Sequence, residues 1–164
     1  MYISELAIKN FRTFKEETKI HFHEGVNVII GHNNAGKTTV IKALELLFSE
    51  KRKRLTIDDF NKNLTIEDLL KAPPKIVISA ILTESDKEED YSDDLVTVST
   101  WLIKIDSPYK AQITYEFFLP DKELDDYIND MKKIESDNIN DYWNEIQYNY
   151  LRKYVQKIYV GNPD

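Results

Sequence analysis

The sequence contains no cysteine and only four glycines among its 164 residues. Without cysteine the chain forms no disulfide bond and offers no thiolate ligand to a metal, as is common for cytoplasmic proteins. It also lacks a run of eighteen apolar residues, so no membrane-spanning helix is expected. The N-terminal residues show neither the basic nor the apolar part of a signal peptide. We therefore expect a cytoplasmic protein without a membrane partner, folded as one domain over residues 1–164.

Charge is distributed unevenly along the chain. The net charge is −7, and residues 83–94, with seven acidic side chains and one lysine, contribute −6 of it. We expect that segment to be a long, exposed hairpin loop. The remainder is close to neutral, so the overall charge does not exclude DNA contact elsewhere. The basic run KRKR at 51–54 either contacts DNA phosphates or complements the dipole at the end of a helix, and the second interpretation is preferred.

Hydrophobic patterns predict an α/β fold. Alternation predicts strands at 2–11 and 18–22, and the continuous apolar run Val26–Ile30 is typical of a strand buried on both faces of a mainly parallel sheet. Helical spacing follows at 37–50. Three β-rich segments predict an antiparallel meander: 75–82, 95–105 and 111–119. From Asp121 the pattern is helical, broken near 136–138, and an aromatic stripe in the second helix, expected as core, extends to Ile158.

The segment GHNNAGKT at residues 31–38 matches the phosphate-loop pattern G-x-x-x-x-G-K-[ST]. Gly31 and Gly36 permit backbone conformations in which successive N–H groups point at one anion. A helix N-terminus directly after the loop favours a polyphosphate. Lys37 is placed to reach the β- and γ-phosphates as the catalytic lysine, and the Thr38 hydroxyl is placed to bind Mg²⁺. The sequence therefore predicts a site for ATP with Mg²⁺.

The phosphate-loop sequence GxNNAGKTT, together with the preceding segment ELAIKNFRTFKE, resembles the corresponding sequences of ABC-type P-loop ATPases of the SMC, RecF and OLD (overcoming lysogenisation defect) group. Within that AAA ATPase group, the N-terminal ATPase part of OLD-family ATP-dependent endonucleases is the most similar, over roughly residues 1–60, including IDDF at 57–60. The resemblance implies an ABC-ATPase-like N-terminal lobe, with a mixed core sheet, a flanking antiparallel sheet over 1–22 and 75–119, and C-terminal helices.

The resemblance also implies where the nucleotide lies. Arg12, in the group's N-F-R element, is expected beside it. A solvated charge at the end of a strand is the alternative for Arg12. The group's Q-loop glutamine has three candidates, Gln112, Gln147 and Gln156, and none has a persuasive context. The residues expected to bind the nucleotide are Arg12, Asn33, Asn34, Ala35, Gly36, Lys37, Thr38 and Thr39.

Other elements of the group are missing from the sequence. A Walker B motif needs four apolar residues before an Asp–Glu pair, and the segments LTIDD, EFFLPD and AILTE do not satisfy it. The signature sequence needs adjacent glycines, which the chain lacks. The sequence is therefore expected to be an N-terminal ATP-binding lobe from a longer protein, in which DNA and a homodimer formed through paired heads are the implied partners.

Two other functions are compatible with a phosphate loop. A small P-loop phosphotransferase (kinase) needs an arginine-bearing lid and an acceptor-binding carboxylate, for which no clear candidates are found. A regulatory module that binds ATP without hydrolysing it needs neither. The preferred hypothesis is an ATP-binding portion of an ATPase in DNA processing or phage defence, in which hydrolysis depends on a second lobe.

Overall fold

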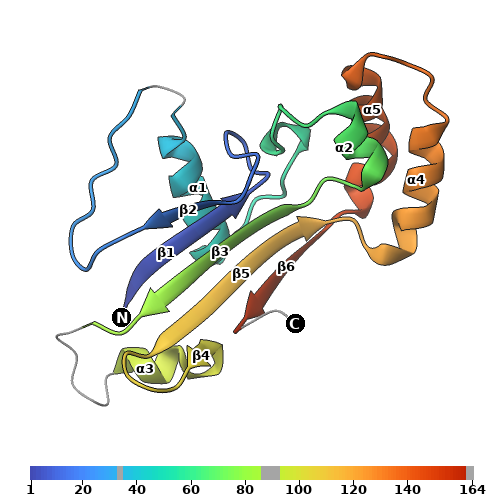
Figure 1. Cartoon of the computed structure of the whole chain (residues 1–164). Coiled ribbons are helices and arrows are strands. Elements are labelled where there is room, and N and C mark those ends of the chain that lie inside the picture. The colour runs from blue at the N-terminus through green and yellow to red at the C-terminus, as the bar shows by residue number, and fades with distance from the viewer. Residues whose placement is uncertain (33–34, 86–92, 162–164) are drawn as a thin grey trace.

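The structure, a computed structural model, describes residues 1–32, 35–85 and 93–161. Within these ranges one sheet of six strands forms the centre of the molecule (Figure 1). Its strand order is β2-β1-β3-β5-β4, with β6 also beside β5, and every pairing is antiparallel. The strands are β1 (Tyr2–Lys9), β2 (Thr18–His21), β3 (Ile76–Thr83), β4 (Leu102–Lys104), β5 (Lys110–Phe118) and β6 (Val155–Val160).

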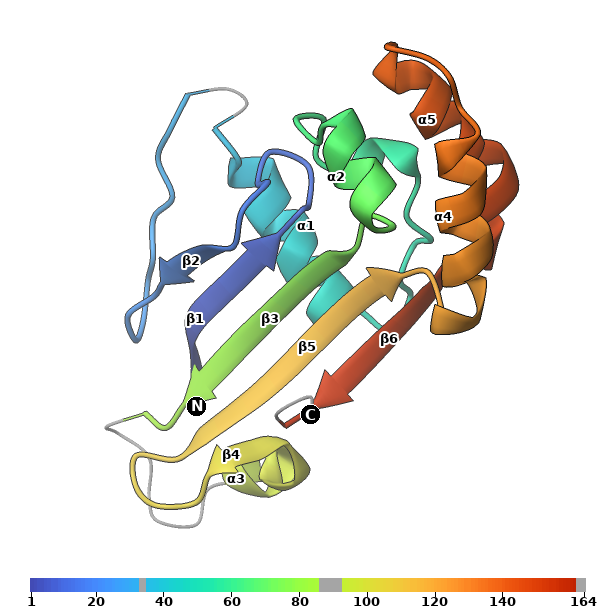
Figure 2. The same ribbon diagram turned by 45° about the vertical axis from the view of Figure 1, so that its right-hand side comes forward.

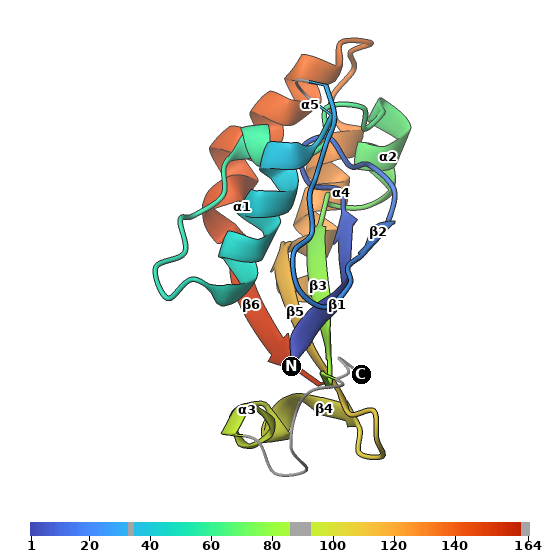
Figure 3. The same cartoon turned by 90° about the vertical axis from the view of Figure 1, so that its left-hand side faces the viewer.

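Helices lie on one face and at both ends of this sheet (Figure 1). They are α1 (Lys37–Phe48), α2 (Ile66–Lys71), α3 (Asp93–Thr97), α4 (Leu124–Lys132) and α5 (Ile139–Glu145). A π-helical turn (Ile146–Tyr150) and a 3₁₀ turn (Leu151–Lys153) connect α5 to β6. Figure 3, which views the sheet along its edge, shows α1 beside one face, and Figure 2 shows α4 and α5 at the end of β5. No helix among the described residues is long and apolar enough to cross a membrane.

The core lies between the sheet and α1. Alternate residues of the central strands face α1, because side chains of a strand point to opposite faces in turn. Ile78 is paired with Ile8 on one side and Tyr115 on the other, and all three are fully buried. From α1, the buried side chains are Thr39, Val40, Ala43, Leu46 and Leu47. The apolar residues of α1 therefore recur at helical spacing because one face of the helix packs on the sheet, as expected.

The α/β class, the flanking antiparallel sheet and the helix at 37–50 are confirmed, but the strand predicted at 26–30 is wrong. That segment has no regular structure, and Val26, Val28 and Ile30 are 93%, 75% and 89% exposed. A strand buried on both faces needs hydrogen-bonded neighbours and covering helices. No strand among the described residues pairs with it, so the parallel component of the expected mixed sheet does not form within this part of the chain.

The predictions at 95–105 and after Tyr150 are also corrected. Residues 95–105 form part of α3, a 3₁₀ turn at Ser99–Trp101 and the short strand β4. The predicted meander places this strand between β3 and β5, but β4 pairs with the other edge of β5, and β3 pairs with β5 directly. β6 replaces the end of the predicted second helix. β6 is rich in β-branched residues, and it pairs with β5 along Ile113–Phe118, where it supplies backbone hydrogen-bond partners to the edge of β5. This tertiary pairing overrides the helical spacing of the segment. Residues 86–92, most of the predicted acidic hairpin loop, lie outside the described ranges.

The aromatic stripe is core, as predicted. Tyr142 and Tyr150 are buried, and Tyr154 lies against Phe117 and Phe60, with ring centroids 5.0 and 5.8 Å away. The buried hydroxyl groups have partners: Tyr154 donates to the carbonyl oxygen of Pro74 at 2.9 Å, as Tyr127 does to that of Leu69 at 2.8 Å. These bonds join the C-terminal helices to the segment around α2.

Alkaline pH is expected to unfold the protein through these tyrosines. Burial raises the pKa of Tyr127 and of Tyr154 above the ordinary value of 10.0. The unfolded chain therefore loses these protons first, so the stability they contribute is complete below pH 10 and is lost as the pH rises through the folded-state values. Urea unfolding followed by circular dichroism should show the free energy falling between pH 9.5 and 11.5, by up to about 1.4 kcal/mol per pH unit for each tyrosine. A Tyr127→Phe variant with an unchanged pH slope would contradict this explanation.

Candidate nucleotide-binding site

The phosphate loop meets α1 at Gly36, and the conformation there requires glycine. Gly36 has φ 94°, in the left-handed region that side chains disfavour. A Cβ at this position would lie 2.8 Å from Cζ of Phe14 and 3.2 Å from Oγ1 of Thr13. The end of the loop therefore lies directly against the turn at Asn10–Phe14, which follows β1.

The start of α1 presents unpaired backbone donors. No side chain caps this end, and its first turn holds no acidic residue. The first intrahelical bond described is from the N–H of Val40 to the carbonyl oxygen of Gly36, at 3.0 Å. The preceding N–H groups of Lys37, Thr38 and Thr39 consequently lack intrahelical acceptors. Together with the helix dipole, they favour an anion at this position.

The two threonines at this end differ in their surroundings. Thr39 is buried and its hydroxyl lies 3.2 Å from that of Thr13, so it joins the helix start to the neighbouring turn. Thr38 is exposed. Of the two hydroxyl groups predicted near the nucleotide, that of Thr38 is therefore the accessible one.

Lys37 folds back over the loop. Its ammonium group donates to the carbonyl oxygens of Gly31 and, at 3.0 Å, of His32. These acceptors are neutral, and a phosphate oxygen is a stronger partner for an ammonium group. The lysine therefore already lies over the loop that the motif assigns to phosphate.

Arg12 is neither free nor simply solvated. Its guanidinium group donates twice to Oδ1 of Asp59, from Nε at 3.0 Å and from Nη2 at 2.7 Å. The Arg12 side chain is 34% exposed and that of Asp59 only 10%. The backbone N–H of Arg12 also donates to the carbonyl oxygen of Asp59 at 2.8 Å. The alternative interpretation of Arg12, a solvated charge at the end of a strand, is thus replaced by an ion pair with the IDDF segment.

Asn61 fixes the same turn from its other side. Its amide group donates to the carbonyl oxygen of Arg12 at 2.6 Å, and its backbone N–H donates to the side chain of Asn10 at 3.3 Å. Asn10 and Arg12 have φ 54° and 51°, unusual for residues other than glycine, and these hydrogen bonds hold them there. Asp59 and Asn61 are therefore candidate positioning residues that the phosphate-loop motif does not indicate, and the IDDF segment is the signal in the sequence that points to Asp59.

A hollow of about 490 Å³ lies beside this assembly. Thr13 lines it and also contacts Thr39 at the start of α1, so the hollow adjoins the phosphate loop. Its walls are Arg12, Thr13, Asp58, Phe60, Asn61, Lys62 and Asn63. The arrangement can therefore accept an anion at the helix start and a larger, partly polar group next to it.

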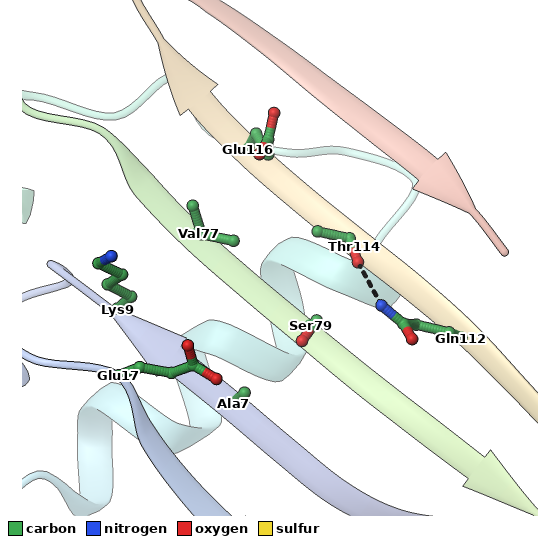
Figure 4. A pocket seen from close by; sticks show the side chains of 8 residues that line it. All are labelled: Ala7, Lys9, Glu17, Val77, Ser79, Gln112, Thr114 and Glu116. Carbon is green, nitrogen blue, oxygen red and sulfur yellow. Dashed lines mark hydrogen bonds between the residues drawn. The ribbon is translucent and has the colours of Figure 1, made fainter. Parts of the chain in front are cut away.

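The structure does not bring all predicted residues together. Asn33 and Asn34 lie outside the described residues, and Ala35 is exposed, with its N–H donating to His32 at 3.1 Å. Gln112 lines a different hollow, on the sheet face that α1 does not cover, where its amide donates to Thr114 at 3.3 Å (Figure 4). It therefore does not face the phosphate loop.

Two of the remaining motif candidates, Gln156 and Asp59, hold neighbouring residues in place. Gln156 accepts a hydrogen bond from the Tyr115 hydroxyl at 3.1 Å, and Gln147 lies in the π-helical turn. Asp59 of LTIDD is occupied by Arg12 and by the N–H of Thr56, at 2.9 Å. In the described part of the chain, no group of three His, Cys, Asp or Glu side chains is arranged to hold a metal.

Gly36→Ala is expected to destabilise the protein by about 1–3 kcal/mol, from left-handed strain and from the contact with Phe14. Gly25→Ala is the matched control, because Gly25 also has a positive φ, 91°, but nothing lies within 4 Å of an added Cβ. Urea unfolding of both variants separates the two causes. Equal losses would show that the approach of Phe14 to the loop is unimportant.

Comparison with known proteins supports a nucleotide site. The AAA ATPase domain family matches residues 1–162 of the chain. The structural maintenance of chromosomes protein 3 homolog of Plasmodium falciparum (isolate 3D7) is 44% identical over 50 residues, which is 30% of this chain and 4% of that protein. The DNA replication and repair protein RecF of Limosilactobacillus reuteri (strain DSM 20016) is 41% identical over 58 residues, 35% of this chain and 15% of RecF.

Among solved structures, one described for the ATP-driven dimerization and DNA stimulated activation of SMC ATPases has a TM-score of 0.47 and 17% identity, covering 72% of this chain and 64% of that one. The chain spans only a small part of the length of the curated relatives named above. The family match, by contrast, extends over nearly all of its residues. This chain belongs to the AAA ATPase domain family.

Proposed function

We propose that the chain is the ATP-binding N-terminal portion of an ATPase of the OLD, RecF and SMC group, acting in DNA processing or phage defence. The observation that carries this proposal is the start of α1, where unpaired N–H groups, Lys37 and the strained Gly36 meet within one loop. The names of the RecF and SMC relatives support a role connected with DNA.

In this proposal the triphosphate lies over the N-terminus of α1. The backbone N–H groups of residues 35–39 would bind it, Lys37 would exchange its two carbonyl partners for the β- and γ-phosphates, and the Thr38 hydroxyl would hold Mg²⁺. Mg²⁺ supplies charge neutralisation to the phosphates. The nucleoside would then lie in the hollow beside Thr13, where Arg12, held in position by Asp59, forms part of the wall.

Hydrolysis needs groups beyond these. We place the water-activating carboxylate and the signature sequence in a further lobe and in a second head, which together close over the bound ATP. The chain by itself therefore binds ATP·Mg²⁺ and turns it over slowly or not at all, and the paired heads couple the ATP state to DNA.

Two measurements on the chain test the proposal together: ATP binding by calorimetry, and phosphate release with and without duplex DNA. Binding without appreciable turnover is expected. Robust turnover by the chain alone would favour a small phosphotransferase, although Arg52 and Arg54 both donate to backbone carbonyls and so do not form an arginine-bearing lid. Absence of ATP binding would contradict the proposal.

A further inference from the structure

A basic hollow lies at the opposite end of α1 from the phosphate loop. It has a volume of about 520 Å³, and its walls come from the last turns of α1, the segment 51–56 and the 3₁₀ turn that follows. Figure 3 shows this segment running outward from the C-terminal end of α1 before it returns to the body of the molecule. The hollow adjoins the one beside the phosphate loop, because Arg12 and Asp58 line both, but the KRKR residues in its walls follow the C-terminal end of α1.

The arginines of the KRKR run anchor the segment. Arg52 donates to the carbonyl oxygens of Leu46, at 2.7 Å, and Leu47, at 3.3 Å, in the last turn of α1. Arg54 donates to three carbonyl oxygens, of Leu151, Arg152 and Tyr154, at 3.0–3.1 Å. The preferred interpretation, that the run complements the end of a helix, is thus confirmed for Arg52. Carbonyl partners position a guanidinium group but leave its positive charge uncompensated.

The lysines of the run are not used in this way. Lys51 and Lys53 are exposed, and no ion pair or side-chain hydrogen bond to another described residue holds their ammonium groups. A helix-end role explains the arginines but gives no reason for lysines at the positions between them. In a chain of net charge −7, this run alone contributes +4.

The acidic side chains of the hollow do not cancel this charge. Asp59 is paired with Arg12 at 2.7 Å, and Asp58 with Lys62 at 2.9 Å. Glu45 is the remaining acidic residue of the walls. Five cationic side chains of the walls have no carboxylate partner among the described residues: Lys42, Lys51, Arg52, Lys53 and Arg54. The hollow and its outer rim therefore attract a polyanion.

We propose that this basic hollow binds the phosphate backbone of duplex DNA. Closely spaced lysine and arginine side chains on an exposed segment suit the repeated single charges of a phosphodiester backbone, which is bound without regard to base sequence. The choice of DNA over another polyanion rests on the proposed function. The arginines fix the segment on the protein surface, and the lysines contact phosphates.

The test compares two double variants that remove the same charge. Lys51→Gln/Lys53→Gln alters the run, and Lys122→Gln/Lys132→Gln alters exposed lysines on the Asp121–Glu123 turn and α4. Binding of a fluorescent 20-base-pair duplex is followed by anisotropy from 50 to 250 mM NaCl. The first variant should bind on the order of tenfold more weakly, with a salt slope lower by about 1.8, whereas the control should retain wild-type affinity.

Poly-glutamate and ATP serve as further probes. Poly-glutamate should compete poorly with the duplex, and ATP affinity should be the same in wild type and both variants. The proposal is overturned if wild type does not bind duplex at 50 mM NaCl, if both variants lose affinity equally, or if poly-glutamate binds as tightly as DNA. Loss of ATP binding with DNA binding retained would overturn the proposed function but not this surface.

Discussion

Replacing Lys37 with alanine is expected to weaken ATP binding by about 100-fold, because a hydrogen bond to a charged group contributes about 1.5–3 kcal/mol. Among the described residues, the partners of its ammonium group are the loop carbonyl oxygens of Gly31 and His32. These contacts lie on the surface, so little stability depends on them. The variant should therefore remain folded while losing affinity, as calorimetry with ATP and Mg²⁺ and a parallel urea titration will show.

Lys42→Ala is the control for this variant. Lys42 lies on the same helix but lines the basic hollow at its other end. Removing it changes the net charge equally and is expected to leave ATP affinity within about twofold of wild type, since distant surface charges are screened. Equal losses in the two variants would mean that the lysine acts only through overall charge, which contradicts a phosphate contact by Lys37.

Asp59→Ala should lower the free energy of unfolding by about 2–3 kcal/mol, somewhat less than breaking a fully buried pair because Arg12 is partly exposed. Asp59 accepts two bonds from Arg12 and one from the N–H of Thr56, and its side chain is only 10% exposed. The loss therefore loosens the turn that supports both Gly36 and the adjoining hollow.

The neighbouring aspartate gives the matched control. Asp58 pairs with Lys62 on the surface, with its side chain 82% exposed, so Asp58→Ala should leave unfolding unchanged within error. The double variant Arg12→Ala/Asp59→Ala should recover part of the loss, because no unpaired charge then remains. Equal losses at Asp58 and Asp59, or simple additivity of the Arg12 and Asp59 losses, would contradict a specific ion pair.

The strongest local patterns predicted the structure best. β1, β3, β5 and α1 have regular apolar periods over many residues, and their positions were predicted to within a few residues. The start of the phosphate-loop helix was also predicted, because the motif and the amphipathic pattern coincide at Lys37. Local sequence is informative where one short segment determines its own conformation and its buried face.

Features that depend on distant partners were missed. β6 forms because β5 offers an edge to Val155–Val160, and nothing in the local spacing indicates that pairing. The apolar run Val26–Ile30 has strand-forming residues, but its conformation depends on neighbours that the described residues do not supply. The pair between Arg12 and Asp59 joins residues 47 positions apart, which no single-sequence pattern locates.

The most direct test of the account is to map the binding of ATP·Mg²⁺ by amide nuclear magnetic resonance of the labelled chain. The account predicts that the largest shifts are at Gly36, Lys37, Thr38 and Thr39, with smaller shifts at Thr13 and Asn61 around the adjoining hollow. Magnesium alone should not reproduce them. Saturable binding with its main shifts away from the start of α1, or no binding at millimolar ATP, would contradict the central claim.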